Sequence, residues 1–385
     1  MSLNIFVVFT LIMLWQYYRS GFEKTSCINA IFAGMWVLFS IEYFVTNDYI
    51  VYHTGFYDES IQTIWEPLYR LLLRLFAPLG FTVFNSAVAA FEMFTLCFMF
   101  KRFCPKRYMW VGILFFILSV SNMMSYMCFK RQFLAQMVAI WTLYFMIDSQ
   151  NRFRYAWAAF AFVCAVNIHT SAYAALAYFI LPLFRLRIGK IGMSVVGLLF
   201  IGSLSFQLAG YSELLDTALT LVQGKDSDRY GRYITDIEDE ETEDFAAGTV
   251  EIAFNAFYLL LLLYYNRSVS RTYYWLFLLS IFSMLLRIML VGDLYRLSFY
   301  FSIVNFFTIP ILLVQLEQQP SSLLRRAVYL IFLTSMIVIP AKSYYNAMSG
   351  SKVTYITARF KKYNTIFDEA PDLTEFQFDG TREIN

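Results

Sequence analysis

Charged side chains are scarce in this chain. Asp, Glu, Lys and Arg together make up 15% of its 385 residues, against roughly 25% in soluble domains. Hydrophobic residues account for 59% and aromatic residues for 20%, and the mean hydropathy is +0.54. A soluble chain of this length would need a much larger polar surface. The composition therefore predicts a protein that crosses a membrane many times.

Three further absences narrow the class of protein. The sequence lacks the alternation of apolar and polar residues that marks the strands of a membrane barrel, and its continuous apolar runs predict α-helices instead. The five cysteines show neither metal-site spacing nor a disulfide framework. The net charge of +2 is too small to suggest a nucleic-acid partner. We therefore expect no metal, no cofactor and no nucleic acid.

Apolar runs of membrane-spanning character occur at 3–18, 26–45, 82–100, 108–126, 132–147, 190–209, 250–265, 273–291, 295–314 and 326–341. One further run, 155–184, would be about 45 Å long as a single helix, whereas the hydrocarbon core is about 30 Å thick. Basic residues flank this run on both sides, and Lys and Arg in short loops mark the cytoplasmic side. Both ends then share a side, which predicts a helical hairpin that turns at "NIHTSA", residues 167–172.

With this hairpin the sequence predicts an all-α bundle of about twelve transmembrane helices. The cations of the short loops all fall on one face: Arg19, Lys24, Lys101, Arg102, Lys106, Arg107, Arg152, Arg154, Arg185, Arg187, Lys190, Arg267, Arg271, Arg325 and Arg326. We expect a transmembrane domain at 1–341, with two larger external loops at 46–81 and 210–249, and an external tail at 342–385. Both termini are then external.

Ionisable residues gather on the predicted external face. His169, one of only two histidines, lies at the hairpin turn, and Arg131, Arg287 and Arg296 lie near helix ends. Taken singly, an arginine at a helix end usually reaches toward the interface, and a histidine in a turn is usually a satisfied polar residue. Their convergence favours a functional site, because ionisable groups in a membrane are costly and the planar guanidinium matches phosphate oxygens. Carboxylates among the tyrosines of loop 46–81 suit sugars, so the expected ligand has an anionic head, a sugar part and a lipid part.

Several short motifs, in order over residues 1–310, resemble one family. The stretch "FKRQFLAQMVAIWTLYFMI" resembles the Arg-Gln motif that opens a helix in EpsG-type proteins, relatives of the Wzy O-antigen polymerases. The stretch "NIHTSAYAALAYFIL" is similar to their His-[Thr/Ser]-[Ser/Ala] hairpin, and "NDYIVYHTGFY", "WEPLYRLLLRLF" and "DRYGRY" resemble segments of their external loops. Where the family carries an arginine before a Gly-Thr-Asp stretch, "SIEYFVTND" offers Glu42 and no glycine.

The resemblance implies that the chain polymerises surface polysaccharide at the external face of the bacterial cytoplasmic membrane. The growing glycan would pass from undecaprenyl diphosphate to a hydroxyl of the next lipid-linked repeat unit. The substrate is then an undecaprenyl-diphosphate-linked oligosaccharide, and a chain-length regulator and a flippase are candidate partners. Since no metal cluster is visible in the sequence, we predict a metal-independent reaction.

Matching motifs assign roles to Asp48, Tyr52, Glu66, Arg131, His169, Arg229 and Tyr230. Topology and charge add Arg287 and Arg296. Cations at Arg131, Arg287 and Arg296 would stabilise the departing diphosphate. His169, with an ordinary pKa of about 6.5, is a candidate base, and Asp48 is the competing base or orients the acceptor. Tyr52 and Glu66 would line the sugar site, and Arg229 and Tyr230 would bind substrate from the large loop.

Two rival functions share parts of this inventory. A flippase or other transporter of lipid-linked sugars would need ionisable residues at the membrane centre, where Glu92 is the clearest candidate. An O-antigen-ligase-like glycosyltransferase would share the arginines and the base and differ in its acceptor. The concentration of charge toward the outer face favours catalysis on that face.

Overall fold

The computed structural model describes residues 3–43, 45, 47–119, 123, 126–184, 186–208, 249–289, 296–318, 322–349 and 365–367. Within these ranges the regular secondary structure is helical, apart from one isolated β-bridge that joins Glu42 to Thr365. Most of the predicted external loop 210–249, including Arg229 and Tyr230, lies outside the described residues, as does most of the tail 342–385.

The N-terminal part packs as three neighbouring helices. These are α1 (Leu3–Arg19), α2 (Thr25–Ser40) and α6 (Phe81–Phe103), with α2 between the other two. Each is an apolar run without acidic residues in its first turn. The chain leaves α1 through Gly21, whose φ of 66° lies in the left-handed region that glycine adopts without steric cost.

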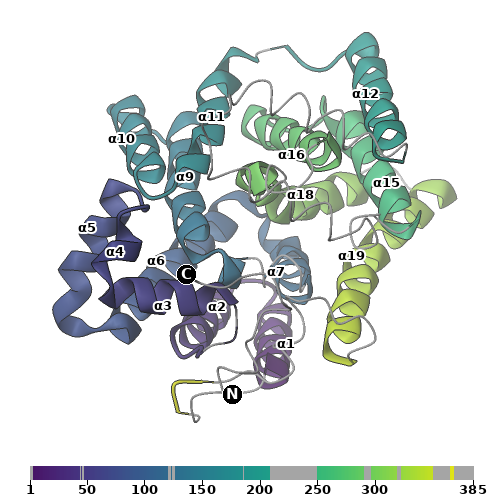
Figure 1. Ribbon diagram of the computed structural model, residues 1–385. Coiled ribbons are helices and arrows are strands. Elements are labelled where there is room, and N and C mark those ends of the chain that lie inside the picture. The colour runs from purple at the N-terminus through teal and green to yellow at the C-terminus, as the bar shows by residue number, and fades with distance from the viewer. Residues whose placement is uncertain are drawn as a thin grey trace.

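The middle part surrounds α9. Helix α7 (Met109–Leu118) precedes α9 (Lys130–Ile147), and α10 (Arg154–Val166) follows it antiparallel. After α10 come the short elements η3 (Thr170–Leu176), α11 (Ala177–Ile180) and η4 (Leu181–Leu183). Helix α9 packs against α10, α6 and η3, so its side chains are mostly buried. Figure 1 shows α9 beside α10.

The C-terminal part contains α12 (Lys190–Leu208), α15 (Thr249–Tyr265), α16 (Arg271–Met289), α17 (Phe299–Ser302), α18 (Asn305–Glu317) and α19 (Leu323–Ser349). Helix α18 is almost entirely buried and packs against α7, α16 and α19. A glycine allows its close approach to α7, because a Cβ at Gly112 would lie 2.4 Å from the backbone oxygen of Phe306.

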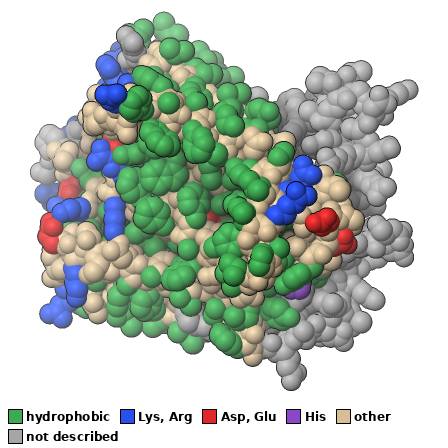
Figure 2. Space-filling view, turned by 90° about the vertical axis from the view of Figure 1, so that its left-hand side faces the viewer, with side chains coloured by type: hydrophobic (Ala, Val, Ile, Leu, Met, Phe, Trp, Pro, Cys, Tyr) green, Lys and Arg blue, Asp and Glu red, His purple; other side chains and the backbone are tan. Residues whose placement is uncertain are grey.

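Among the described residues, three helices are by length and composition able to cross a membrane: Phe81–Phe103, Arg296–Glu317 and Leu323–Asn346. Several other apolar helices of 10–17 residues accompany them. Figure 2 shows hydrophobic side chains covering the middle of one face, with Lys and Arg toward its edges. Large apolar side chains such as Trp15, Phe94 and Phe160 are exposed. The chain is therefore a helical membrane protein, and the number of about twelve spans stays a prediction.

The predicted hairpin at 155–184 is confirmed. In a single straight helix, Phe162 and Phe179 would lie about 25 Å apart, but their ring centroids are 5.7 Å apart. The ring of Phe162 also lies 6.3 Å from that of Tyr173. The chain reverses at Asn167–His169, between the end of α10 and the start of η3.

Basic short loops contact one another at one end of the bundle. The ion pairs are Lys106 with Glu23, Arg102 with Asp148 and Arg107 with Glu317, and the guanidinium of Arg187 donates to the backbone oxygens of Asn266 and Val269. These contacts join the loops next to α2, α7, α10, α12, α16 and α18. The predicted common face is thus one end of the molecule, and its cytoplasmic location stays a prediction.

Residues 46–81, predicted as an external loop, are largely helical. They form α3 (Asn47–Tyr57), α4 (Glu59–Gln62), α5 (Pro67–Phe76) and η1 (Ala77–Leu79). The carboxylate of Asp58 caps α4 by accepting from the backbone N–H of Ser60 at 2.9 Å. A proline starts α5, where its missing N–H costs nothing. Position between charged loops predicts which side a segment occupies, but it says nothing about its secondary structure.

Candidate active site

The tip of the hairpin docks on the start of α5. The backbone oxygen of Asn167 accepts from the N–H groups of Leu68 at 2.9 Å and Tyr69 at 3.3 Å. These N–H groups belong to the first turn of α5, and N–H groups in a first turn have no hydrogen-bond acceptor within their own helix. The hairpin tip therefore satisfies the helix start, and the two segments hold each other in place.

Arg131 and Glu66 form the central ion pair of the site. Arg131 Nη1 lies 2.7 Å from Glu66 Oε2, and the two side chains are 18% and 13% exposed. The guanidinium carbon lies 5.8 Å from the ring centroid of Trp65 and 6.0 Å from that of Tyr69. Glu66 Oε1 accepts from the backbone N–H of Thr170 at 2.9 Å. Glu66 thus joins α5, α9 and the hairpin, which is a positioning role added to the predicted sugar contact.

Arg131 keeps hydrogen-bonding capacity beyond this pair. Its Nε is buried and has no hydrogen-bond partner among the described residues. An unmet donor in a buried guanidinium is costly. A bound phosphate oxygen would satisfy this donor, which is the chemistry expected of the site.

His169 is held in one tautomer by Ser171. The backbone N–H of Ser171 donates to His169 Nδ1 at 3.2 Å, and Ser171 Oγ lies 2.7 Å from the same nitrogen. Because a backbone N–H can only donate, Nδ1 carries no proton. A neutral ring then carries its proton on Nε2. The hydroxyl of Tyr300 lies 3.0 Å from Ser171 Oγ and extends the network.

The His169 ring stays neutral near pH 7. Burial, together with the positive charges of Arg131 and Arg296, lowers its pKa to about 4 against the opposing effect of Glu66. At neutral pH, His169 therefore offers an N–H donor at Nε2. A proton acceptor would have to be supplied by another residue.

Arg296 joins the same cluster. Its guanidinium carbon lies 4.2 Å from the ring centroid of Phe129, and its backbone oxygen accepts from Gln132 Nε2 at 3.0 Å. Its charge acts on His169 together with that of Arg131. Two arginines far apart in the sequence thus act on one imidazole.

Helix α3 brings Asp48 and Tyr52 to this cluster. Tyr52 is buried, with its ring centroid 6.1 Å from that of Trp65. Burial raises the pKa of the Tyr52 phenol, the charge of Asp48 raises it further, and Arg131 opposes both. The pKa of the Cys128 thiol is raised to about 12, chiefly by burial and by the charge of Asp48, against the opposing effects of a backbone hydrogen bond from Asp48 and of the charge of Arg296. Asp48 therefore acts on the same side chains as the two arginines. It acts on Tyr52 together with Arg131, and on Cys128 together with Arg296.

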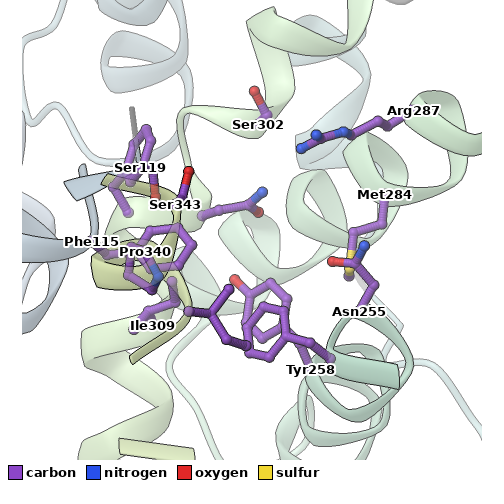
Figure 3. A pocket seen from close by; sticks show the side chains of 14 residues that line it. Phe115, Ser119, Asn255, Tyr258, Met284, Arg287, Ser302, Ile309, Pro340 and Ser343 are labelled. Atoms are coloured by element: carbon purple, nitrogen blue, oxygen red, sulfur yellow. The ribbon is translucent and has the colours of Figure 1, made fainter. Parts of the chain in front are cut away.

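Arg287 occupies a different place. It lines a pocket of about 180 Å³ between α7, α15, α16, α17, α18 and α19. Figure 3 shows its side chain at the rim of this pocket near Ser302, with Asn255 and Tyr258 on another wall.

The structure thus brings Asp48, Tyr52, Glu66, Arg131, His169 and Arg296 together. Helix α17 contributes Ser302 to the lining of the Arg287 pocket, whereas its Tyr300 contacts Ser171.

Several residues of the cluster received no role from the sequence. Ser171 and Lys130 stand inside the quoted motifs, so the motifs were their signal. Tyr300 and Asn85 carry no local signal, since they reach the site only through packing of α17 and α6. Within the described ranges, no three His, Cys, Asp or Glu side chains form a group suited to a metal ion.

Comparison with protein families adds one decisive observation. The model of the EpsG family matches residues 25–364. The chain belongs to the EpsG family. This confirms the resemblance, and at the level of the family it indicates a Wzy-like polysaccharide polymerase. Comparisons with curated proteins and with solved structures give no match. The EpsG match spans every residue of the cluster, from Asp48 to Arg296.

Proposed function

We propose that this EpsG-family protein polymerises a surface polysaccharide such as capsule, exopolysaccharide or O-antigen. It transfers the growing glycan from undecaprenyl diphosphate to the next lipid-linked repeat unit, at the external face of the bacterial cytoplasmic membrane. One observation carries the proposal. Two arginines and a neutral imidazole, from separate segments, meet at the end of the bundle opposite the basic short loops.

The step is a displacement at the anomeric carbon. The acceptor hydroxyl oxygen forms the new glycosidic bond while the bond from the anomeric carbon to the diphosphate oxygen breaks. The electron pair leaves with undecaprenyl diphosphate, and the hydroxyl proton passes to a carboxylate. Arg131 and Arg296 stabilise the negative charge that develops on the leaving diphosphate. No metal ion is needed when two cations serve this role.

The tautomer of His169 bears on the choice of base. Its Nδ1 is occupied by Ser171, so Nε2–H is a donor for a phosphate or sugar oxygen. Of the two candidates named from the sequence, this favours Asp48 as the acceptor of the hydroxyl proton and makes His169 a donor to substrate. Tyr52 and Glu66 border the sugar, while Arg229 and Tyr230 are proposed to bind substrate from outside the described residues.

Arg287 is proposed to bind substrate at its own pocket. The reaction joins two molecules that each carry a diphosphate and sugars, and both need to be held. Amide and hydroxyl groups of Asn255, Tyr258 and Ser302 line the pocket with aromatic rings. This is a lining suited to sugar hydroxyls and sugar faces.

The deciding experiment compares Arg131→Ala and His169→Ala with Arg152→Ala in cells that make the polysaccharide. Arg152 is an exposed cation at the opposite end of the bundle and serves as the matched control. We expect the first two variants to lose polymerisation by about 10²–10³-fold, leaving single repeat units on lipid outside the membrane, while Arg152→Ala makes normal polymer. If both site variants made full-length polysaccharide at normal protein levels, that result would contradict the proposal.

The rivals predict other outcomes of the same experiment. Loss of a flippase leaves repeat units on the cytoplasmic side. Glu92, the residue that kept this rival open, is buried in α6 near the charges of Lys130 and Glu42, and its Oε1 has no hydrogen-bond partner among the described residues. The side of the membrane on which repeat units accumulate therefore decides between the two functions. A ligase-like glycosyltransferase would transfer finished chains to a different acceptor and would not lengthen them.

A further inference from the structure

A second, almost fully buried ion pair lies beside the active site. Lys130 directly precedes Arg131 at the start of α9, and its ammonium pairs with the carboxylate of Glu42. The Lys130 side chain is 13% exposed and that of Glu42 is 0% exposed. Lys130 also donates to Asn85 Oδ1 at 2.6 Å and lies 5.2 Å from the ring centroid of Tyr49. None of these four residues carries a role in the proposed reaction.

The partners of Lys130 are themselves fixed by backbone contacts. Asn85 Nδ2 donates to the backbone oxygen of Phe39, near the end of α2, at 2.9 Å. Glu42 forms an antiparallel bridge with Thr365, and the N–H of Ile366 donates to the backbone oxygen of Ile41 at 2.9 Å. Thr365 is buried. The C-terminal segment 365–367 thus lies against the residue that holds Lys130.

The start of α9 needs such partners. Two consecutive cations stand in its first turn, at the end of a helix where the macrodipole is positive. The first turn contains no acidic residue, and Phe129 provides no side-chain cap. Adjacent helix positions point about 100° apart. Glu42 on one side and Glu66 on the other therefore supply, through space, the negative charge that the helix start lacks.

We propose that Lys130, Glu42 and the C-terminal segment 365–367 are positioning elements of the active site. They fix the first turn of α9 so that Arg131 is held at Glu66 and aimed at the substrate diphosphate. The segment 365–367 keeps the carboxylate of Glu42 out of water. The attraction between Glu42 and Lys130 is stronger in this buried position, because an exposed ion pair contributes little. This inference rests on the proposed function, since it assigns these residues to the arginine of that site.

The test uses two matched pairs of variants in the full-length protein. Ile366→Pro removes the N–H that donates to Ile41, and Ile366→Ala keeps it. Lys130→Met removes the ammonium at similar length, and Lys130→Arg keeps a cation. Each protein is purified, reconstituted into lipid vesicles and supplied with lipid-linked repeat units extracted from cells that lack the polymerase.

We expect Lys130→Met and Ile366→Pro to lower kcat by about tenfold to 10²-fold with little change in KM, because a misplaced arginine loses transition-state stabilisation. Ile366→Ala should match the wild type, and Lys130→Arg should recover most of the activity. A merely structural defect would lower the yield and melting temperature of the protein instead of separating kcat from KM.

A double-mutant cycle then asks whether the elements act through Arg131. In an Arg131→Lys background, which keeps a charge and residual activity, Lys130→Met and Ile366→Pro should add little further loss. Equal losses in both backgrounds would overturn the inference, as would wild-type kcat in either variant while Arg131→Ala is inactive. If Arg131→Ala itself retains full activity, the proposed function has failed first.

Discussion

At the scale of single residues, the orientation of one imidazole decides the chemistry of the site. His169 accepts two hydrogen bonds at Nδ1 from Ser171, so its Nε2 is a donor. The histidine count and the motif indicate that His169 matters, but they do not distinguish a base from a donor. That distinction depends on a backbone N–H two residues along the chain.

Substituting His169 separates the two roles. A glutamine side chain can donate an N–H at about the position of Nε2, but it cannot act as a base. We expect His169→Gln to keep polymerisation within about tenfold of the wild type, while His169→Ala loses about 10²–10³-fold. Polymer yield from lipid-linked repeat units is the measurement, and equal inactivity of the two variants would restore His169 as the base.

The neutral state of His169 also predicts a pH effect on stability. Its folded-state pKa of about 4 lies below the unfolded value of 6.5. Between these values the unfolded chain binds a proton that the folded protein does not, so the free energy of unfolding decreases as pH falls from 6.5 toward 4. The contribution is fully present above pH 6.5.

Thermal unfolding in detergent checks this sign. We expect the melting temperature of the wild type to fall more between pH 7 and pH 4.5 than that of His169→Gln, in which this group is absent. Carboxylates that titrate in the same range are common to both proteins. The same shift in both proteins would mean that His169 titrates normally in the folded state.

At the scale of elements, close helix packing positions the site. Helix α7 lies against α18 at Gly112, and α18 continues the chain from α17, which carries Tyr300 into the site. Apolar periodicity indicates that both segments are helices. It does not reveal that their backbones approach closely enough to exclude a methyl group, since this depends on how two distant helices cross.

Gly112→Ala should therefore destabilise the protein by about 1–3 kcal/mol, because its Cβ would lie 2.4 Å from the Phe306 backbone oxygen. The control is Gly197→Ala in α12, where nothing lies within 4 Å of the added Cβ. There, alanine should be neutral or stabilise the helix by up to about 1 kcal/mol. Melting temperatures of both variants in detergent test the contrast, and a neutral Gly112→Ala would refute the close contact.

At the scale of the whole molecule, the two ends of the bundle differ in chemistry. One end gathers the ion pairs of the basic short loops, and the other gathers the Arg131 cluster with the docked segment 365–367. The same helices run between them, so the two sets lie on opposite sides. The distribution of cations predicts that the first end faces the cytoplasm.

Cysteine labelling in intact cells tests that orientation. Ser60, an exposed residue of α4, belongs to the site end, and the exposed Arg152 belongs to the basic end. In a background without the native cysteines, a membrane-impermeant maleimide should label Ser60→Cys in intact cells and Arg152→Cys only after the membrane is opened. The reverse pattern would place the site on the cytoplasmic side and exclude a reaction at the external face.

The sequence alone was sufficient for the class of protein, the positions of most helices, the hairpin and the family. These follow from local quantities: apolar run length, the sidedness of loop cations and short motifs. The hairpin is the clearest case, because a run too long for the bilayer with basic residues at both ends has to turn back. The helices of residues 46–81 were missed, because loop position carries no information on secondary structure.

Only the tertiary structure decided which of the candidate residues share a site. It placed Arg296 with Arg131 and His169 and left Arg287 in a separate pocket, although both arginines follow from the same charge argument. It also joined Thr365 to Glu42, and Glu42 to Lys130, beside Arg131. Composition and spacing record what a chain contains along its length. Distances between segments remote in sequence arise from how helices cross and pack, and these distances determine which charges act on one another.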